Sequence, residues 1–122
     1  MVRKSLSFIV SYWQTLTVII LLAITLLSLW PLEELPPVPG TDKTHHVIAY
    51  GFLMFPAALR RPKNWHLIGL LFFVYSGLIE CLQPYVNRYA EWLDMAANTA
   101  GIIAGIVVAE CLLRLFPPGK SS

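Results

Sequence analysis

Residues 77–105, GLIECLQPYVNRYAEWLDMAANTAGIIAG, place polar and ionisable side chains in or beside segments that are otherwise strongly apolar. These side chains are Glu80, Gln83, Arg88, Glu91, Asp94 and Asn98. An ionisable group at membrane depth is energetically costly unless it is paired or hydrated. A chain that keeps several such groups close together is therefore expected to use them, and this stretch is the predicted location of the function.

The composition of the whole chain is that of an integral membrane protein. Of 122 residues, 57% are hydrophobic and only 13% are charged. Apolar segments cover residues 12–30, 44–59, 65–83 and 92–116, each near or above the roughly 20 residues that a helix needs to cross the hydrocarbon core. The sequence therefore predicts a single all-α domain, an antiparallel bundle of four transmembrane helices. The net charge of +2 is too small to indicate a nucleic-acid partner.

The first apolar segment could be mistaken for a cleaved signal peptide, because Arg3 and Lys4 precede it. The apolar run continues to Leu29 without a small-residue cleavage pattern, so we interpret it as a retained anchoring helix after a short basic lead. The proline-rich residues 31–40 predict an extended outer loop, and Pro56 is expected to kink or end the second helix. Residues 117–122 are expected to form a disordered tail.

Most basic residues lie at the N-terminus, between the second and third segments, or at the C-terminal end. They are Arg3, Lys4, Arg60, Arg61, Lys63, Arg114 and Lys120. By the positive-inside rule, both termini and that connection face the cytoplasm, which predicts a multi-pass protein of the inner (cytoplasmic) membrane. Cys81 and Cys111 are predicted near opposite membrane faces, too far apart for a disulfide, and are expected to be small buried apolar residues.

Polar residues recur at helical spacing at one end of three predicted helices. The stripes are Asp42, His46 and Tyr50 in the second helix, Gly69, Ser76, Glu80 and Gln83 in the third, and Asp94, Asn98, Gly101 and Gly105 in the fourth. Gly101 and Gly105 form a small-xxx-small pair that lets another helix approach closely. The predicted topology places all three polar ends in the outer leaflet, where they would line one outward-facing pocket.

Candidate site residues come from these stripes and from the loop between the last two helices. The candidate catalytic residues are Glu80, Asp94 and His46, and the candidate ligand-binding residues are Asp42, Lys43, Tyr50, Gln83, Arg88, Glu91 and Asn98. In the alternative interpretation these groups only pair with one another, Arg88 with Asp94 or Glu91 for example, and join the helices at about 0.6–2 kcal/mol each. The number of ionisable groups exceeds what helix association needs, which favours a functional site.

Three sequence fragments with these residues occur in a fixed order: DKxxHxxxY at residues 42–50, GxIExxQ at 77–83 and RxxExxDxxxNTxG at 88–101. Their combination resembles the VanZ-like family over about residues 42–105. The resemblance implies a small polytopic membrane protein of the bacterial envelope, and the namesake of that family is associated with low-level resistance to the glycopeptide teicoplanin. The step of four residues from Asp42 selects His46 rather than His45.

Three functions are compatible with these residues. The first is a non-catalytic protein that binds membrane lipids, a lipid-linked cell-wall precursor or a lipoglycopeptide, with Arg88 suited to a phosphate or carboxylate. The second is a membrane enzyme in which Glu80, Asp94 and His46 act as acid and base on a lipid head group. The third is a proton-coupled transporter, which would need oligomerisation and lacks an internal repeat.

Motifs of familiar chemistry are missing from the sequence, which contains no GxSxG, HExxH or Walker motif. We therefore expect no cofactor, and a divalent metal held by two carboxylates and a histidine is a minor variant of the enzyme hypothesis. A homo-oligomer is compatible with the sequence.

Overall fold

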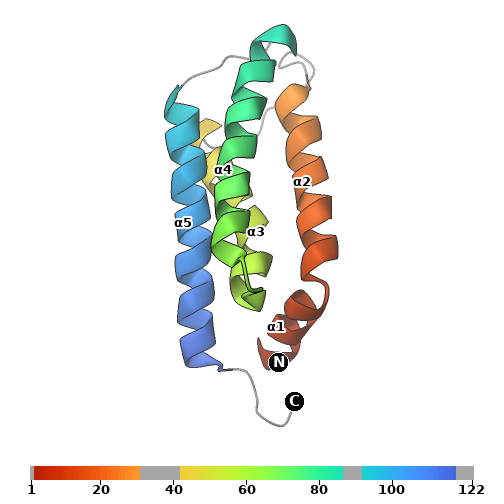
Figure 1. The fold of residues 1–122 in the computed structure, drawn as a ribbon, viewed down its shortest axis with the longest axis vertical. Coiled ribbons are helices and arrows are strands. Elements are labelled where there is room, and N and C mark those ends of the chain that lie inside the picture. Colours follow the sequence, from red (N-terminus) through yellow and green to blue (C-terminus); the bar gives the residue numbers. More distant parts are fainter. Residues whose placement is uncertain (1, 31–41, 87–91, 118–122) are drawn as a thin grey trace.

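The computed structural model describes residues 2–30, 42–86 and 92–117, and all regular structure in these ranges is helical (Figure 1). The elements are α1 (Val2–Ser11), α2 (Trp13–Leu29), α3 (Asp42–Arg60), α4 (Trp65–Leu82), the 3₁₀ helix η2 (Gln83–Val86) and α5 (Trp92–Leu115). The prediction of an all-α fold is confirmed. The predicted outer loop and most of the predicted disordered tail lie outside the described residues.

The beginning of the chain differs from the expectation of a short lead, because its residues form the separate helix α1. Between α1 and α2, Tyr12 has φ −110° and ψ 25°, which departs from α-helical values. The two helices consequently meet at 76°. The prediction of a short basic lead before the first helix thus did not identify α1 as a helix of its own.

Helix α3 continues through Pro56 to Arg60, so this proline does not end the helix. The end comes at Arg61, which has a left-handed φ of 55° and donates its backbone N–H to the Ala57 carbonyl at 2.9 Å. A left-handed residue directly after a helix is a common way to terminate it. The connection to α4 then occupies only a few residues, which places α3 and α4 antiparallel (Figure 1).

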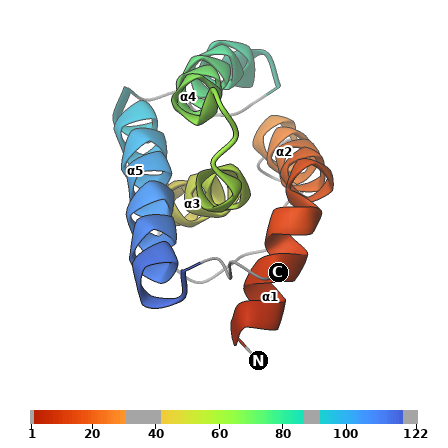
Figure 2. The ribbon, with the colours of Figure 1, turned by 60° about the horizontal axis from the view of Figure 1, so that its bottom comes forward.

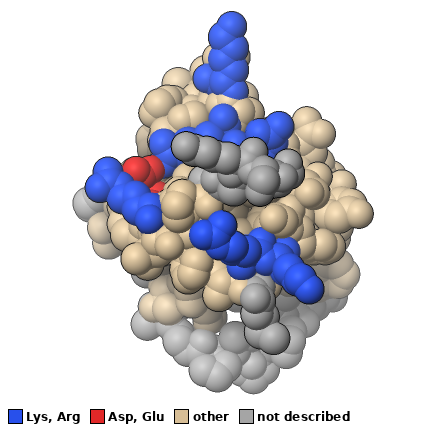
Figure 3. Space-filling model, turned by 90° about the horizontal axis from the view of Figure 1, so that it is seen from below, with Lys and Arg blue, Asp and Glu red and all other residues tan. Residues whose placement is uncertain are grey.

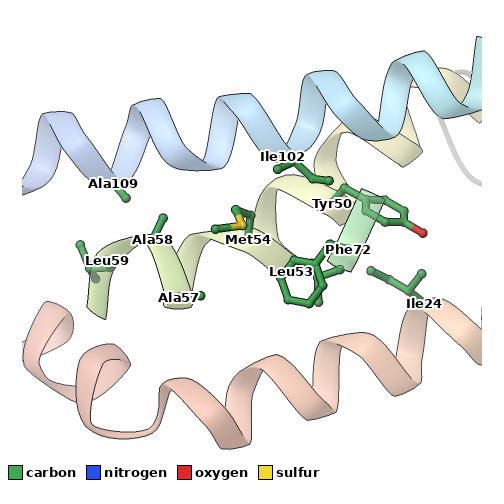
Figure 4. Packing of buried hydrophobic residues seen from close by; sticks show 10 residues of the cluster. All are labelled: Ile24, Tyr50, Leu53, Met54, Ala57, Ala58, Leu59, Phe72, Ile102 and Ala109. Carbon is green, nitrogen blue, oxygen red and sulfur yellow. The ribbon is translucent and has the colours of Figure 1, made fainter. Parts of the chain in front are cut away.

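Helix α3 lies at the centre of the bundle, with α2, α4 and α5 around it (Figure 2). It supplies most of the buried apolar cluster drawn in Figure 4. The members are Tyr50, Leu53, Met54, Ala57, Ala58 and Leu59 of α3, with Ile24 of α2, Phe72 of α4, and Ile102 and Ala109 of α5. The outer helices thus share a core that is built on a single central helix.

The closest helix pair is α3 and α5, and glycines make this approach possible. A Cβ atom added at Gly105 would lie 2.6 Å from the Gly51 carbonyl oxygen, and one added at Gly101 would collide with the Val47 carbonyl oxygen. A Cβ atom at Gly51 would lie 3.4 Å from the Gly101 carbonyl oxygen. The predicted small-xxx-small contact is confirmed, and the helix that uses it is α3.

The outward faces of the helices are apolar. Exposed large side chains include Leu22 and Leu26 on α2, Leu71 and Leu78 on α4, and Val107 and Val108 on α5. Such a surface is suited to lipid chains rather than to water. Cys81 and Cys111 are also exposed, so the expectation that they are buried is wrong. Their weakly polar thiols belong to the same outward-facing surface as the leucines.

By length and composition, two segments could each cross a membrane: Trp65–Tyr85 and Leu93–Leu115. The bent pair of α1 and α2 gives a third candidate span if the two helices are taken together as one span. Helix α3 is outside this set, because Asp42, Lys43 and His46 make its first turns polar. The structure therefore supports two or three spans by this criterion. Helix α3 packs against α2, α4 and α5, although its Ile48 and Phe52 side chains are exposed.

We expect Gly101→Ala to destabilise the bundle by about 1–3 kcal/mol, because the added methyl group forces α3 and α5 apart. The matched control is Gly69→Ala, where the nearest atom to the new methyl group is the flexible Met54 thioether sulfur at 3.5 Å. The control should be neutral or slightly stabilising, since alanine favours a helix over glycine. Thermal unfolding in detergent measures both variants, and equal stability of the two would contradict this packing account.

Candidate functional site

Polar side chains are buried in the half of the bundle where α3 and α5 begin and α4 ends (Figure 1). Five of them expose 9% or less of their surface: Ser76, Glu80, Gln83, Asp94 and Asn98. Together with His46 and Tyr50 they form what we call the polar cluster. On the same part of α4, Leu78 and Leu82 are exposed. This distribution, with polar groups inside and leucines outside, is the reverse of the distribution in a water-soluble protein.

Helix α4 contributes Ser76 and Glu80, and Gln83 follows at the first position of η2. The steps of four and three residues keep all three on one face. The α-helix ends at Leu82 because Pro84 follows shortly after, and the chain tightens into η2. This ending places Gln83 at the last turn, where its side chain is 1% exposed. The predicted buried face of α4 is thus present in the fold.

Gln83 connects α4 to α2. Its Nε2 donates a hydrogen bond to the Ser28 carbonyl oxygen at 3.1 Å. Its Oε1 is buried and has no hydrogen-bond partner within the described ranges. A buried acceptor without a partner costs about 1–3 kcal/mol. This oxygen is therefore a position where an added donor, from water or from a ligand, would be stabilising.

Helix α5 begins at Trp92 and carries Asp94 in its first turn, where the helix dipole favours a negative charge. One turn further on, the Asn98 side chain is 1% exposed and its Oδ1 lies 2.7 Å from His46 Nδ1. Because an amide oxygen only accepts, His46 Nδ1 carries the proton in this bond. In a neutral imidazole the other nitrogen, Nε2, is then an acceptor.

Helix α3 contributes His46 and, one turn later, Tyr50. The Tyr50 side chain is only 2% exposed, and its ring lies at the end of the apolar cluster with the hydroxyl directed away from Met54 (Figure 4). Its hydroxyl is within electrostatic range of Glu80 and Tyr75. Tyr50 thus forms the boundary between the apolar core and the polar cluster.

The contact between α4 and α5 beside the polar cluster is made by the Met95 side chain. Ser76 Oγ donates to the Phe73 carbonyl at 2.7 Å and lies 3.6 Å from the Met95 sulfur. The Met95 thioether also fills the space above Gly77, 3.5 Å from where a Cβ atom would be. A methionine packs adaptably into such gaps. The wall of the polar cluster between these helices is therefore deformable.

The anchoring role predicted for the first apolar segment is incomplete, because α2 takes part in the polar contacts. Besides the Ser28 carbonyl, Thr25 Oγ1 forms a hydrogen bond with the Tyr75 hydroxyl of α4. Thr25 also donates to its own helix at the Leu21 carbonyl, 2.8 Å away. The backbone acceptor at Ser28 has no sequence signature, so sequence reasoning did not identify it.

Six of the ten residues predicted for the site have described side chains, and all six lie in the polar cluster. They are His46, Tyr50, Glu80, Gln83, Asp94 and Asn98. Arg88 and Glu91 lie outside the described residues, as do the side chains of Asp42 and Lys43 at the start of α3. Ser76 was assigned to the buried stripe of α4 but not to the predicted site.

Chemically, the polar cluster offers two carboxyl groups, an imidazole, two amides, a phenol and a serine hydroxyl, surrounded by apolar side chains. These groups can accept and donate hydrogen bonds to a polar head group, or exchange protons with it. In the described part of the chain, no group of three or more His, Cys, Asp or Glu side chains is arranged to hold a metal ion.

Apolar outward faces, buried polar groups and membrane-length helices define an α-helical multi-pass membrane protein. The chain belongs to the VanZ/LLP1 family, because the model of that family matches residues 3–114. The resemblance expected from the motifs is thereby confirmed and extended to the first two helices. Neither a curated protein nor a solved structure matches the chain.

The hydrogen bond between His46 and Asn98 should be measurable as a coupling between α3 and α5. In a double-mutant cycle with His46→Ala and Asn98→Ala, we expect a coupling of about 0.6–1.7 kcal/mol in the free energy of unfolding. Denaturation in mixed detergent micelles measures it.

The control cycle combines Asn98→Ala with Thr17→Val, since Thr17 donates to the Trp13 carbonyl of its own helix at 2.6 Å and has no further hydrogen bond within the described residues. Its coupling should be near zero. A zero coupling for the first pair as well would show that the bond between His46 and Asn98 does not contribute to stability.

Proposed function

We propose that the polar cluster binds the head group of an amphiphilic, lipid-linked cell-wall ligand in the outer leaflet of the bacterial cytoplasmic membrane. The observation that carries this proposal is the burial of polar side chains from three helices at one end of a bundle with an apolar exterior. The unpartnered Gln83 Oε1 supports it, because a bound hydroxyl or amide donor would satisfy this oxygen.

The ligand class follows from the two surfaces that meet at the cluster. A head group with hydroxyl, amide or phosphate groups would be bound by the polar side chains, while its lipid chain would lie against the exposed leucines of α4. Arg88 and Lys43 belong to this proposal as the cations that would contact a phosphate or carboxylate. A protein that sequesters such a precursor, or a lipoglycopeptide, would lower susceptibility to glycopeptides.

The same proposal includes four membrane spans with both termini in the cytoplasm. Helix α2 has 17 residues and α3 has 19, or about 25 and 28 Å at 1.5 Å per residue, close to the roughly 30 Å of the hydrocarbon core. A central α3, contacted by protein on most sides, needs less apolar surface than a helix facing lipid. The described Lys and Arg side chains lie at the end opposite the polar cluster, which agrees with the positive-inside rule (Figure 3).

Reporter fusions in a bacterial host test this topology. Alkaline phosphatase inserted after residue 40 or 90 should be active, because both positions face outward, and fusions after residue 62 or 122 should be inactive. Green fluorescent protein at residue 122 should fluoresce. Activity after residue 62 would contradict the four-span arrangement without testing the ligand.

Mass spectrometry of lipids bound to the purified full-length chain tests the ligand. We expect a phosphate-containing lipid to co-purify with the wild type and to be depleted about tenfold or more in Arg88→Ala, since a charge-assisted contact is worth about 1.5–3 kcal/mol. The matched control is Arg114→Ala, which removes an arginine that pairs with Glu110 at the opposite end. Equal retention by both variants would contradict the proposed site.

Catalysis is the main alternative function, and the orientation of the His46 ring supports it. With Nδ1 bonded to Asn98, Nε2 is available as a base, and Glu80 and Asp94 complete an acid and base set. Conversion of an added lipid by the wild type but not by Glu80→Gln would establish an enzyme. Flux of protons or ligand in proteoliposomes would instead identify the transporter of the third hypothesis.

A further inference from the structure

We propose that α1 and the basic end of the bundle bind the head groups of anionic phospholipids at the membrane surface. Helix α1 is only 10 residues long and meets α2 at 76°. At 1.5 Å per residue it extends about 15 Å, half of the hydrocarbon thickness. If α2 runs along the membrane normal, α1 lies nearer to the membrane plane (Figure 2).

The side chains of α1 divide into faces that fit this position. Leu6, Ile9 and Val10 pack against the apolar core, and the opposite side exposes Lys4 and Ser7. The bundle thus covers the apolar face of α1, and the basic and polar side chains that remain exposed can reach the lipid head groups.

A flank of α1 is aromatic and exposed. Phe8 and Tyr12 are 57% and 53% exposed, and their ring centroids are 4.9 Å apart. Trp13 follows at the first position of α2. Aromatic side chains concentrate at the level of the lipid head groups, because one part of each ring is apolar and the other is polar. The aromatic flank therefore sets α1 at the depth where lipid phosphates lie.

Several groups of Lys and Arg side chains are spread over this end of the molecule, with other residues between them (Figure 3). Arg3, Lys4, Arg60 and Lys63 are all exposed. Arg3 reaches the other end of the chain, donating to the Pro117 carbonyl at 3.3 Å. The cations come from α1, from the last residue of α3 and from the connection after it, and we call this end of the molecule the basic end.

Some of the cations at the basic end are paired with Glu110, and the others are not. It pairs with Arg61 and, at 3.0 Å, with Arg114, and the Arg61 guanidinium also lies 4.5 Å from the centre of the Trp65 ring. Among the described residues, Glu110 is the carboxylate at this end, since Glu80 and Asp94 belong to the polar cluster. Within the described ranges, the other four cations, Arg3, Lys4, Arg60 and Lys63, have no ion pair with a carboxylate, so their charges can attract an anion from outside the chain.

The anion that fits is a phospholipid phosphate. The basic end borders exposed apolar side chains, including Val2 and Phe8, which a bilayer would cover. An anionic lipid supplies both the apolar chains for these residues and the phosphate for the cations. Each basic residue near an anionic membrane surface adds about fivefold in affinity. This inference does not depend on the ligand proposed for the polar cluster.

The test reconstitutes the full-length chain in phosphatidylcholine vesicles that contain a small fraction of brominated phosphatidylglycerol or brominated phosphatidylcholine. Quenching of tryptophan fluorescence reports lipid contact, and a W30F/W92F background leaves Trp13 and Trp65, which begin α2 and α4 at the basic end. We expect stronger quenching by the brominated phosphatidylglycerol. Replacing both basic residues of α1 (R3Q/K4Q) should lower this preference at least about fivefold.

The charge-preserving variant R3K/K4R is the matched control and should keep the preference. A salt titration of the unaltered basic end gives a second measurement, because the Debye length falls from about 30 Å at 0.01 M to 3 Å at 1 M. The preference should then collapse. A preference that survives both R3Q/K4Q and high salt would overturn the proposal, as would equal quenching by the two brominated lipids.

Discussion

The contact between the backbones of α3 and α5 is the constraint on which the rest of this structure depends. Gly101 and Gly105 leave no side chain between α5 and the carbonyl groups of α3. The resulting proximity brings Asn98 within hydrogen-bonding distance of His46 and leaves the opposite side of α3 to α2 and α4. Without this approach, the polar groups of α3 and α5 would face lipid separately.

The inverted polarity of the bundle follows from this central placement. A polar group in a helix that faces lipid has no water to hydrate it, whereas the same group on a surrounded helix can find partners on three neighbours. The contacts of Gln83 with Ser28, His46 with Asn98 and Tyr75 with Thr25 each join different helices. The polar groups therefore serve the association of helices and form a candidate site at the same time.

Helical spacing predicted the buried faces well, because steps of three and four residues define a face whatever the tertiary packing. Ser76 and Glu80 on α4, and Asp94 and Asn98 on α5, are buried as the stripes predicted. The partner of the glycine pair could not be predicted, since a small-xxx-small pattern does not specify which helix approaches. The acceptor on α2 was hidden for a different reason: a backbone carbonyl is present at every residue.

Other predictions failed because they relied on local sequence, whereas the outcome depended on the packing of the whole bundle. The two cysteines were expected to be buried because they are small and apolar, but in a bundle surrounded by lipid the outer surface also accepts apolar groups. The short lead became a helix, and its separation from α2 at Tyr12 carries no proline or glycine that would have indicated a break. Composition thus predicted the membrane environment of the protein more accurately than it predicted where individual helices begin and end.

The central position of α3 also has a consequence for how the protein is made. Its first turns are too polar for it to meet the length and hydropathy criterion that α4 and α5 meet alone. Its principal partner, α5, begins more than 30 residues after the end of α3 and has 24 residues. During synthesis, α5 is therefore made well after α3, and only then can it cover the polar face of α3. The polar first turns of α3 are consequently covered only when α5 is present, so the burial of these groups depends on a helix that is distant in the sequence.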